Sequence, residues 1–487
     1  MSTATPHDVS SISSRPAPKP RAKKLSVALL APDGVALRNF VVNNYVTRHF
    51  ADVTIFHNCP ADVPQPLQRN VHSGATWQRM PPMREQPLSF TLRQTLTFAH
   101  LYWGDTSSMR FTRTRPMGGS WKTRAANHAG RIVGRIMAHQ PGIQMLERAY
   151  FRSVEGFPEV EHYRKLFQAN RPDVVLSGSH RAPAVLAPVL AAKSLGIPVV
   201  TFVASWDNLT SKSRVAAPFD HYLVWSDLMR RELLQFYPHV RPDQATIVGT
   251  PQFDCYADPD ILLPRAEFFR RWDLDLSRPL ICFSGGDAGN CPQDPEHIEI
   301  IMTFIRNGRI KGNPQMVVRP MPVDDGRRYE GVRRQFPELR FCQPAWDHLD
   351  PGDWSRCVPR PEDVQFLANI TQHADLNVNN GSTMTLDYSL HDRPVVNLCF
   401  DVGEVLPGRL PLFDYYNWDH YRPILKFKSA RFSHSADQLA DNINFVLDHP
   451  EADREGRQKL VDLQVGHPPG SAGPLIAEAL QKVIANA

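Results

Sequence analysis

The sequence lacks the features that mark exported and membrane-spanning proteins. No apolar run reaches the roughly 20 residues needed to span a bilayer. The first 23 residues are rich in Ser, Pro and Ala, and they lack the apolar stretch of a secretory signal. We therefore expect residues 1–23 to form a disordered tail and the protein to be cytoplasmic.

Cysteine is sparse, and its spacing is uninformative for metal binding. The seven cysteines lie far apart, no CxxC pair occurs, and no Cys/His group has the spacing of zinc ligands. This pattern is typical of reduced thiols in a cytosolic protein. We predict no metal site and no cofactor.

The chain as a whole has little net charge, but one segment is strongly basic. The net charge is +5 over 487 residues, which does not indicate a nucleic-acid partner. Residues 106–146, however, contain no Asp or Glu. The basic residues of this segment are Arg110, Arg113, Arg115, Lys122, Arg124, Arg131 and Arg135.

Residues 122–139 within this segment carry apolar side chains at helical spacing. The apolar positions are Ala125, Ala129, Ile132, Val133, Ile136 and Met137. Such a helix usually buries its apolar stripe in the protein, and we favour that interpretation. The alternative is a helix that lies on an anionic membrane surface.

What the sequence does contain is an alternation of strand and helix patterns. It begins with the apolar run Leu25–Ala31, and it restarts at Leu280–Phe283 after a Pro-rich segment. The length suits two domains of about 200 residues each. We predict an α/β fold of two Rossmann-like, doubly wound domains with a cleft between them. The predicted N-terminal domain is 24–255 with an insertion at 60–160, the C-terminal domain is 256–470, and 471–487 is a closing helix.

The loops after the strands of the second domain are suited to an anion. Glycine lets the backbone approach a phosphate, and helix N-termini and arginine bind phosphate oxygens. The candidate residues are Ser284, Gly285, Gly286, Arg319, Asn380, Gly381, Ser382 and Thr383. Asp387, one turn further along the same helix, is predicted to accept a ribose hydroxyl. The alternatives are an ordinary N-cap at Ser382, a surface salt bridge at Arg319 and a solvated helix charge at Asp387.

The loops of the first domain carry candidate proton acceptors. His180 follows the strand Asp173–Ser177, Asp207 follows the strand Ile197–Val203, and Asp33 follows the first strand. Each is a candidate for activating a hydroxyl, and His180 has an unperturbed pKa near neutral. Trp206 is predicted to stack on a sugar or base, with Asn208 beside it in the binding site. The alternatives are a structural histidine, a buried polar network and a turn aspartate.

Three segments resemble a known family. The segment Ser205–Lys212 (SWDNLTSK), then Val224-Trp225-Ser226, then Val248–Asp254 (VGTPQFD), resemble motifs of bacterial GT-B-type glycosyltransferase-like proteins. That family is related to the nucleotide-sugar 2-epimerases and the CDP-glycerol glycerophosphotransferases. In the second domain its pattern is matched by Arg319-Pro320, Ser382-Thr383, Asp387 and Arg393-Pro394-Val395. The resemblance covers roughly residues 25–58 and 165–485. The sequence departs from the family's pattern in having Met321 in place of His, and Asp387 in place of the usual Glu.

The resemblance implies a donor nucleotide on the C-terminal domain, an acceptor on the N-terminal domain, and no required metal. We predict a glycosyltransferase that moves a sugar or sugar-like group from a nucleotide-sugar donor to a surface polysaccharide or glycolipid. The predicted partners are that donor, a saccharide or lipid-linked acceptor, and an anionic membrane surface at the inner face of the cell membrane through 106–146. The alternatives are a nucleotide-sugar 2-epimerase and a catalytically degenerate nucleotide-binding protein.

Overall fold

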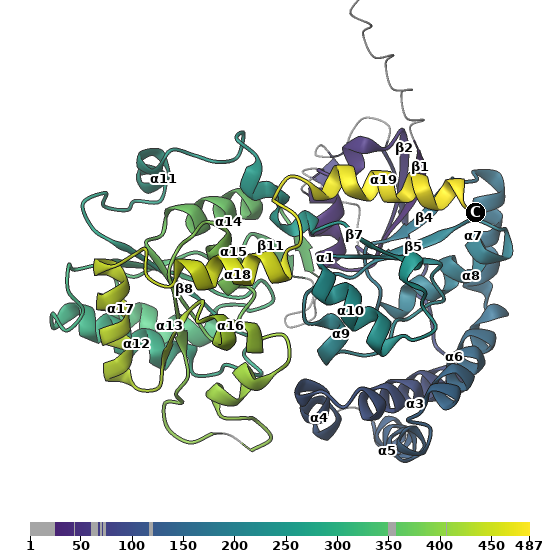
Figure 1. Ribbon diagram of the computed structural model, residues 1–487, viewed down its shortest axis with the longest axis horizontal. Coiled ribbons are helices and arrows are strands. Elements are labelled where there is room, and N and C mark those ends of the chain that lie inside the picture. Colours follow the sequence, from purple (N-terminus) through teal and green to yellow (C-terminus); the bar gives the residue numbers. More distant parts are fainter. Residues whose placement is uncertain are drawn as a thin grey trace, which may run out of the picture.

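Two parallel β-sheets stand side by side in the computed structural model of the chain (Figure 1). The structure describes residues 25–42, 44–59, 67–68, 71, 75–115, 120–348, 357–405 and 407–487, so the predicted tail 1–23 lies outside the described residues. The last strand of the first sheet ends at Ile247 and the first strand of the second begins at Leu280, on either side of the predicted domain boundary.

The first sheet has seven strands in the order β3-β2-β1-β4-β5-β6-β7, and every pairing is parallel. Its strands are β1 (Ser26–Ala31), β2 (Asp52–His57), β3 (Ala75–Arg79), β4 (Val174–Ser177), β5 (Val199–Phe202), β6 (His221–Val224) and β7 (Ala245–Ile247). The central strands β4 and β5 are buried at every residue, as expected for parallel strands covered by helices on both faces.

The second sheet has six parallel strands in the order β10-β9-β8-β13-β14-β15. These strands are β8 (Leu280–Ser284), β9 (Gln315–Arg319), β10 (Arg340–Phe341), β13 (Leu376–Asn379), β14 (Val395–Leu398) and β15 (Arg431–Ser433). A separate antiparallel hairpin joins β11 (Trp346–His348) to β12 (Cys357–Pro359). The prediction of two doubly wound, Rossmann-like domains is confirmed.

Helices fill the connections between these strands. In the first half of the chain they are α1 (Gly34–Leu37), α3 (Pro87–Gly104), α4 (Ser107–Thr114), α5 (Trp121–Ile136), α6 (Gln140–Glu155), α7 (Pro158–Ala169), α8 (Leu186–Ser194), α9 (Asn208–Ser211) and α10 (Asp227–Phe236). In the second half they are α11 (Arg265–Arg271), α12 (Asp294–Arg306), α13 (Glu330–Gln335), α14 (Pro361–His373), α15 (Met384–Leu390), α16 (Arg422–Phe427), α17 (Ala436–Asp448), α18 (Arg454–Gln464) and α19 (Ala472–Ala485). Within the described residues, no helix is both long and apolar enough to cross a membrane.

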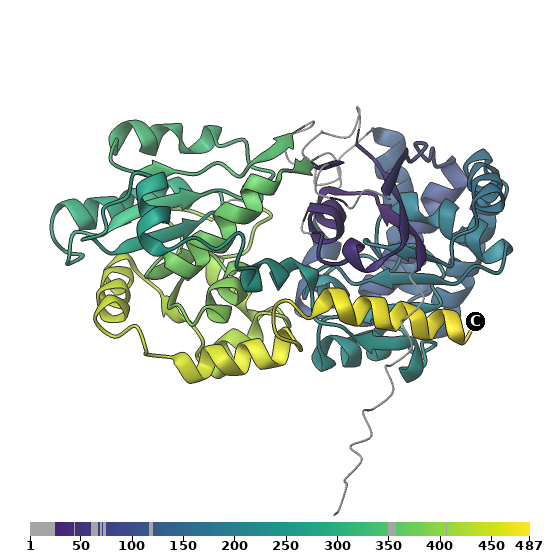
Figure 2. The same cartoon turned by 90° about the horizontal axis from the view of Figure 1, so that it is seen from above.

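The last helix, α19, crosses back and lies on the first domain (Figures 1 and 2). Its start is held by Asp254, whose carboxylate accepts hydrogen bonds from the backbone N–H groups of Gly470, Ala472 and Gly473 at 2.8, 3.4 and 3.2 Å. The final aspartate of the VGTPQFD segment therefore anchors the start of the last helix to the segment between the two sheets.

The insertion after β3 contains the helices α3 to α6, which form a layer at one side of the first domain (Figure 1). Helix α5 packs on α3 through a face of small and polar residues. A Cβ added at Gly134 would lie 2.7 Å from the Cβ of Phe98, and Asn127 is buried. The apolar side chains of Ile132 and Ile136 are exposed. The favoured interpretation of residues 122–139 as a helix with a buried apolar stripe is therefore wrong, because glycines bring the opposite face closest to α3.

Candidate functional site

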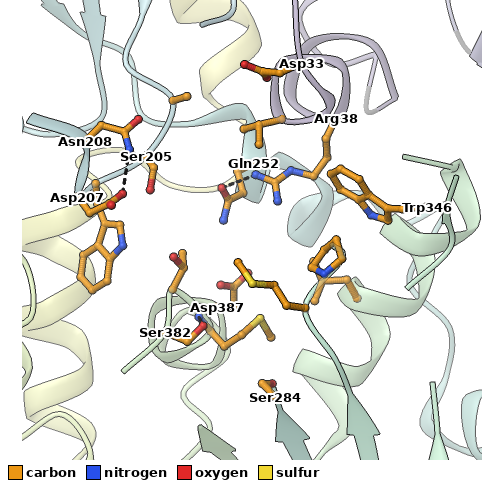
Figure 3. A pocket seen from close by; sticks show the side chains of 18 of the residues that line it. Asp33, Arg38, Ser205, Asp207, Asn208, Gln252, Ser284, Trp346, Ser382 and Asp387 are labelled. Carbon is orange, nitrogen blue, oxygen red and sulfur yellow. Dashed lines mark hydrogen bonds between the residues drawn. The ribbon is translucent and has the colours of Figure 1, made fainter. Parts of the chain in front are cut away.

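A cavity of about 420 Å³ lies between the two domains (Figure 3). It is bordered by the carboxyl ends of β1, β4 and β5 in the first sheet and of β8, β9 and β13 in the second. Open parallel sheets bind ligands at these ends, because the loops there are free to carry polar groups. We call the side lined by residues between 33 and 252 the first-domain wall, and the side lined by residues between 284 and 421 the second-domain wall.

The second-domain wall contains most of the residues that were expected to bind phosphate. They are Ser284, Gly285, Arg319, Ser382 and Thr383. Ser284 and Ser382 face Asp33 and Arg38 across the cavity (Figure 3). The loop before α15 is shaped by Asn379, whose Oδ1 accepts a hydrogen bond from the Ser382 N–H at 3.2 Å.

Arg319 is buried at the end of β9, and only part of its guanidinium is paired. Its Nη2 donates to Oδ2 of Asp363 at 2.9 Å, and the same carboxylate oxygen accepts from the Trp346 indole N–H at 2.8 Å. Nη1 of Arg319 is buried and has no hydrogen-bond partner. A buried cationic N–H without an acceptor is costly, and Arg319 lines the cavity, so an anion that reached Nη1 would stabilise it.

Asp387 lines the second-domain side of the cavity and is hydrogen-bonded within the protein. It is 1% exposed and accepts a hydrogen bond from the hydroxyl of Tyr256, while Arg38 of the first domain lies opposite (Figure 3). Burial raises the pKa of Asp387 to about 6, against the opposing effects of Tyr256 and Arg38. Its predicted contact with a ribose hydroxyl stays a prediction.

Three residues expected in the site do not line the cavity: Gly286, Asn380 and Gly381. The Gly286 N–H and the Asn380 amide both donate to the buried carboxylate of Asp294, the first at 2.8 Å. Gly381 has φ of +55°, and a Cβ there would lie 3.3 Å from the ring of Tyr416. The donor groups of Gly286 and Asn380 are therefore bound to Asp294, and Gly381 gives the turn its left-handed backbone.

On the first-domain wall, Asp33 caps the short helix α1. Its Oδ1 accepts from the Ala36 N–H at 2.8 Å. Burial raises the pKa of Asp33, and the hydrogen bond from Ala36 opposes that rise. A carboxylate with a raised pKa is a stronger proton acceptor than an exposed aspartate.

His180 also lines this wall, but it does not have the near-neutral pKa expected from the sequence. Burial, together with the neighbouring Arg181, lowers the pKa of His180 to about 3. The ring is 2% exposed, and neither nitrogen has a hydrogen-bond partner of good geometry. His180 is therefore neutral at physiological pH and a weak proton acceptor.

Asp207 is held within its own loop. Its carboxylate accepts hydrogen bonds from Asn208 Nδ2 and Ser211 Oγ, both at 3.0 Å, and Lys212 Nζ lies 3.3 Å from Oδ2. Burial works against ionisation, but Lys212 and its neighbours hold the pKa of Asp207 well below its usual range. Asp207 stays ionised and is a weaker base than Asp33.

Trp206 lies at the border of the cavity with its ring already in contact with protein rings. Its centroid lies 5.6 Å from that of His420 and 5.5 Å from that of Tyr421, both in edge-on geometry. The indole is 2% exposed. This contact joins the SWDNLTSK loop to the second domain, and the predicted stacking of Trp206 on a ligand stays a prediction.

The structure adds lining residues that were not among the predicted site residues. They include Arg38, Arg181, Lys212, Gln252 and Trp346. Arg38 Nη2 donates to Gln252 Oε1 at 2.7 Å, which connects the start of the chain to the VGTPQFD segment. Arg38 and Arg181 follow Asp33 and His180 closely in sequence, so a search for cations beside the predicted proton acceptors would have found them. Among the residues the structure describes, no group of three or more His, Cys, Asp or Glu side chains is placed to hold a metal ion.

Comparison with known proteins identifies the fold. Neither a protein-family model nor a curated protein matches the chain. Among solved structures, UDP-GlcNAc 2-epimerase from Methanocaldococcus jannaschii is similar with a TM-score of 0.51 and 11% identity, over 96% of this chain and 100% of that one. A glycosyltransferase from Rickettsia africae is similar with a TM-score of 0.50 and 11% identity, over 95% of this chain and 100% of that one.

The chain has a GT-B-like fold. The resemblance seen in the SWDNLTSK and VGTPQFD segments is thereby confirmed at the level of the fold.

Proposed function

We propose that this protein is an enzyme acting on a nucleotide sugar, and that it transfers the sugar or a sugar-like group to a saccharide or lipid-linked acceptor. The observation that carries the proposal is the interdomain cavity. Its second-domain wall carries hydroxyl groups, backbone N–H groups and the partly paired Arg319, and its first-domain wall carries ionisable side chains. A donor diphosphate suits the first set of groups, and activation of an acceptor hydroxyl suits the second.

In this scheme the donor binds on the second-domain wall. Arg319 Nη1 donates to a phosphate oxygen, and Ser284, Ser382 and Thr383 supply hydroxyl donors around the diphosphate. Asp387 accepts a ribose hydroxyl. These groups stabilise the charge that develops on the leaving nucleoside diphosphate, so the protein residues themselves assist its departure.

Asp33 is the proposed base. Of the three candidates, only Asp33 is a carboxylate with a raised pKa, whereas Asp207 is ion-paired with Lys212 and the pKa of His180 is about 3. Asp33 accepts the proton of the acceptor hydroxyl while the oxygen of that hydroxyl attacks the sugar carbon. The bond between the sugar carbon and the diphosphate breaks in the same step.

The test is turnover by the purified protein with a panel of nucleotide sugars, each with and without saccharide and lipid-linked acceptors. Release of nucleoside diphosphate that requires an acceptor supports transfer. The absence of acceptor-dependent release from every pair would contradict it.

A nucleotide-sugar 2-epimerase is the second candidate, favoured by the similarity of the fold to the M. jannaschii enzyme. Nuclear magnetic resonance of each nucleotide sugar incubated with the protein alone distinguishes the two reactions. An isomer formed without acceptor, and without release of diphosphate, indicates epimerisation.

A further inference from the structure

Helix α5 exposes the face that a water-soluble helix normally buries. Trp121, Ile132 and Ile136 are 69%, 66% and 69% exposed. At about 100° per residue they share an outward arc of roughly 120° with Ala125, Ala129 and Val133. Large side chains clustered on one exposed face mark a surface that has a partner.

The opposite face of α5 explains this arrangement. Gly130 and Gly134 sit so close to α3 that an added Cβ would lie 3.3 Å from the Thr95 hydroxyl and 2.7 Å from Phe98 Cβ. The contact is made by glycine and Asn127, which have little apolar surface to bury. The outward direction of the apolar arc is therefore fixed by tight packing of the helix.

The basic residues beside this apolar arc indicate an anionic partner. Arg124, Arg131 and Arg135 lie along one edge of the apolar arc at about 100° per residue. No carboxylate occurs anywhere from residue 106 to residue 146. Among the described residues, none pairs a carboxylate with Arg124 or Arg135. Apolar side chains edged by arginines that have no carboxylate partner are complementary to an anionic lipid surface, whose headgroups carry phosphates above an acyl interior.

We propose that α5 docks on an anionic phospholipid bilayer. Trp121, Ile132 and Ile136 enter the boundary between headgroups and acyl chains, and Arg124 and Arg135 contact lipid phosphates. This docking rests on the surface of α5 alone and holds whatever reaction the cavity catalyses.

Helix α5 is hydrogen-bonded to the end of α4, where Arg131 Nη2 donates to the carbonyl of Arg115 at 3.3 Å, and α4 contacts the first-domain wall. Ser108 Oγ of α4 donates to the carbonyl of Thr210 at 2.8 Å, and Thr210 lies in the short helix α9 that begins directly after Asp207. Binding of α5 to lipid therefore sets the orientation of the first-domain wall relative to the membrane.

The test is co-sedimentation of the full chain with vesicles of phosphatidylcholine alone or with one-third phosphatidylglycerol. We expect binding to the anionic vesicles that weakens in high salt. Ile132→Ser with Ile136→Ser should weaken binding about tenfold or more. Arg124→Gln with Arg135→Gln should weaken it about fivefold per arginine and reduce its dependence on salt.

Matched controls come from exposed residues elsewhere. Leu276→Ser removes a leucine that is 54% exposed outside α5, and Arg231→Gln with Arg334→Gln removes two exposed arginines of other helices. Both controls should bind vesicles as the wild type does. Brominated lipids should quench part of the tryptophan emission of the wild type, and that part should be lost in Trp121→Phe.

Three results would overturn the proposal. They are no binding to anionic vesicles, binding that survives the isoleucine substitutions, and a dimer in solution that those substitutions dissociate. The last result would assign the face to a second copy of the chain. Because sedimentation requires no substrate, it is independent of the outcome of the turnover test.

Discussion

The first-domain wall of the cavity carries ionisable side chains on loops, whereas the second-domain wall carries hydroxyls, glycine backbone and one buried arginine. On the first wall, burial and neighbouring charges give Asp33, His180 and Asp207 different proton affinities. On the second wall, the ionisable groups Arg319 and Asp387 already have protein partners. This difference suggests that proton transfer belongs to the first domain and binding of a polyanion to the second.

The largest expected effect is on the first wall. Asp33→Asn should lower kcat about a thousandfold, because general-base catalysis contributes roughly 10²–10⁴ in rate. Asparagine caps a helix as well as aspartate does, so the melting temperature should not change. Steady-state kinetics and thermal unfolding of the same preparation measure both quantities. A variant that keeps full kcat would exclude Asp33 as the base.

On the second wall, Arg319→Lys should raise the KM for the donor by about 10- to 100-fold while leaving acceptor KM unchanged. Lysine keeps a charge for Asp363 but loses the free Nη1. Alanine is a poorer test, since it leaves a buried carboxylate unpaired at a cost of about 3–5 kcal/mol. If Arg319→Lys raised the KM for donor and acceptor equally, the assignment of donor binding to the second-domain wall would be contradicted.

A smaller effect is expected from the pH dependence of Asp387. Burial raises its pKa to about 6, so the carboxylate is ionised above pH 6 and protonated below it. Donor affinity should fall about tenfold from pH 7 to pH 5, because a protonated carboxyl accepts a ribose hydroxyl less well. Asp387→Asn should remove that part of the pH dependence. The donor's own phosphates titrate in the same way with the wild type and with Asp387→Asn, so the difference between the two pH profiles reports Asp387.

The smallest effect on turnover is expected from Asp207→Asn, which is the matched control for Asp33. It removes an ion pair with a part-exposed lysine, so the free energy of unfolding should fall by about 1 kcal/mol. Turnover should change less than about threefold, because the low pKa of Asp207 makes it a poor base. If Asp207→Asn lowered kcat as much as Asp33→Asn does, the assignment of Asp33 alone as the base would be contradicted.

The sequence predicted the strands and the loops after them better than it predicted the side-chain partners. Buried parallel strands such as β4 and β8 are continuous apolar runs, so their carboxyl ends, and most of the cavity, could be located. The pattern around Asn380 could not show its partner, because the buried carboxylate that binds its amide, Asp294, lies 86 residues away at the start of α12. The same carboxylate accepts the Gly286 N–H. The pairing of Arg319 with Asp363, 44 residues away, likewise depends on tertiary contacts.

Two local patterns were also misjudged. The apolar spacing of residues 37–49 alone predicts one helix. The structure has instead the end of α1, a π-helical turn at 38–42 and a 3₁₀ turn at 47–49, and Asn44 between them adopts a left-handed φ of 46°. Residues 60–120 are rich in Pro, Arg and aromatic residues, and their pattern alone predicts no clear element, yet Pro87 stands at the start of α3, where proline fits a helix. The sequence pattern of α5 correctly predicted a helix, but the pattern alone could not show which face meets α3.

The central claim is that the second-domain wall binds the donor nucleotide. Isothermal titration of nucleoside diphosphates into the wild type, Arg319→Lys and Asp33→Asn tests it most directly. We predict that one nucleoside diphosphate binds at a single site, that Arg319→Lys weakens its binding about tenfold or more, and that Asp33→Asn leaves it unchanged. Binding lost in Asp33→Asn but retained in Arg319→Lys, or no binding of any nucleoside diphosphate, would contradict the claim.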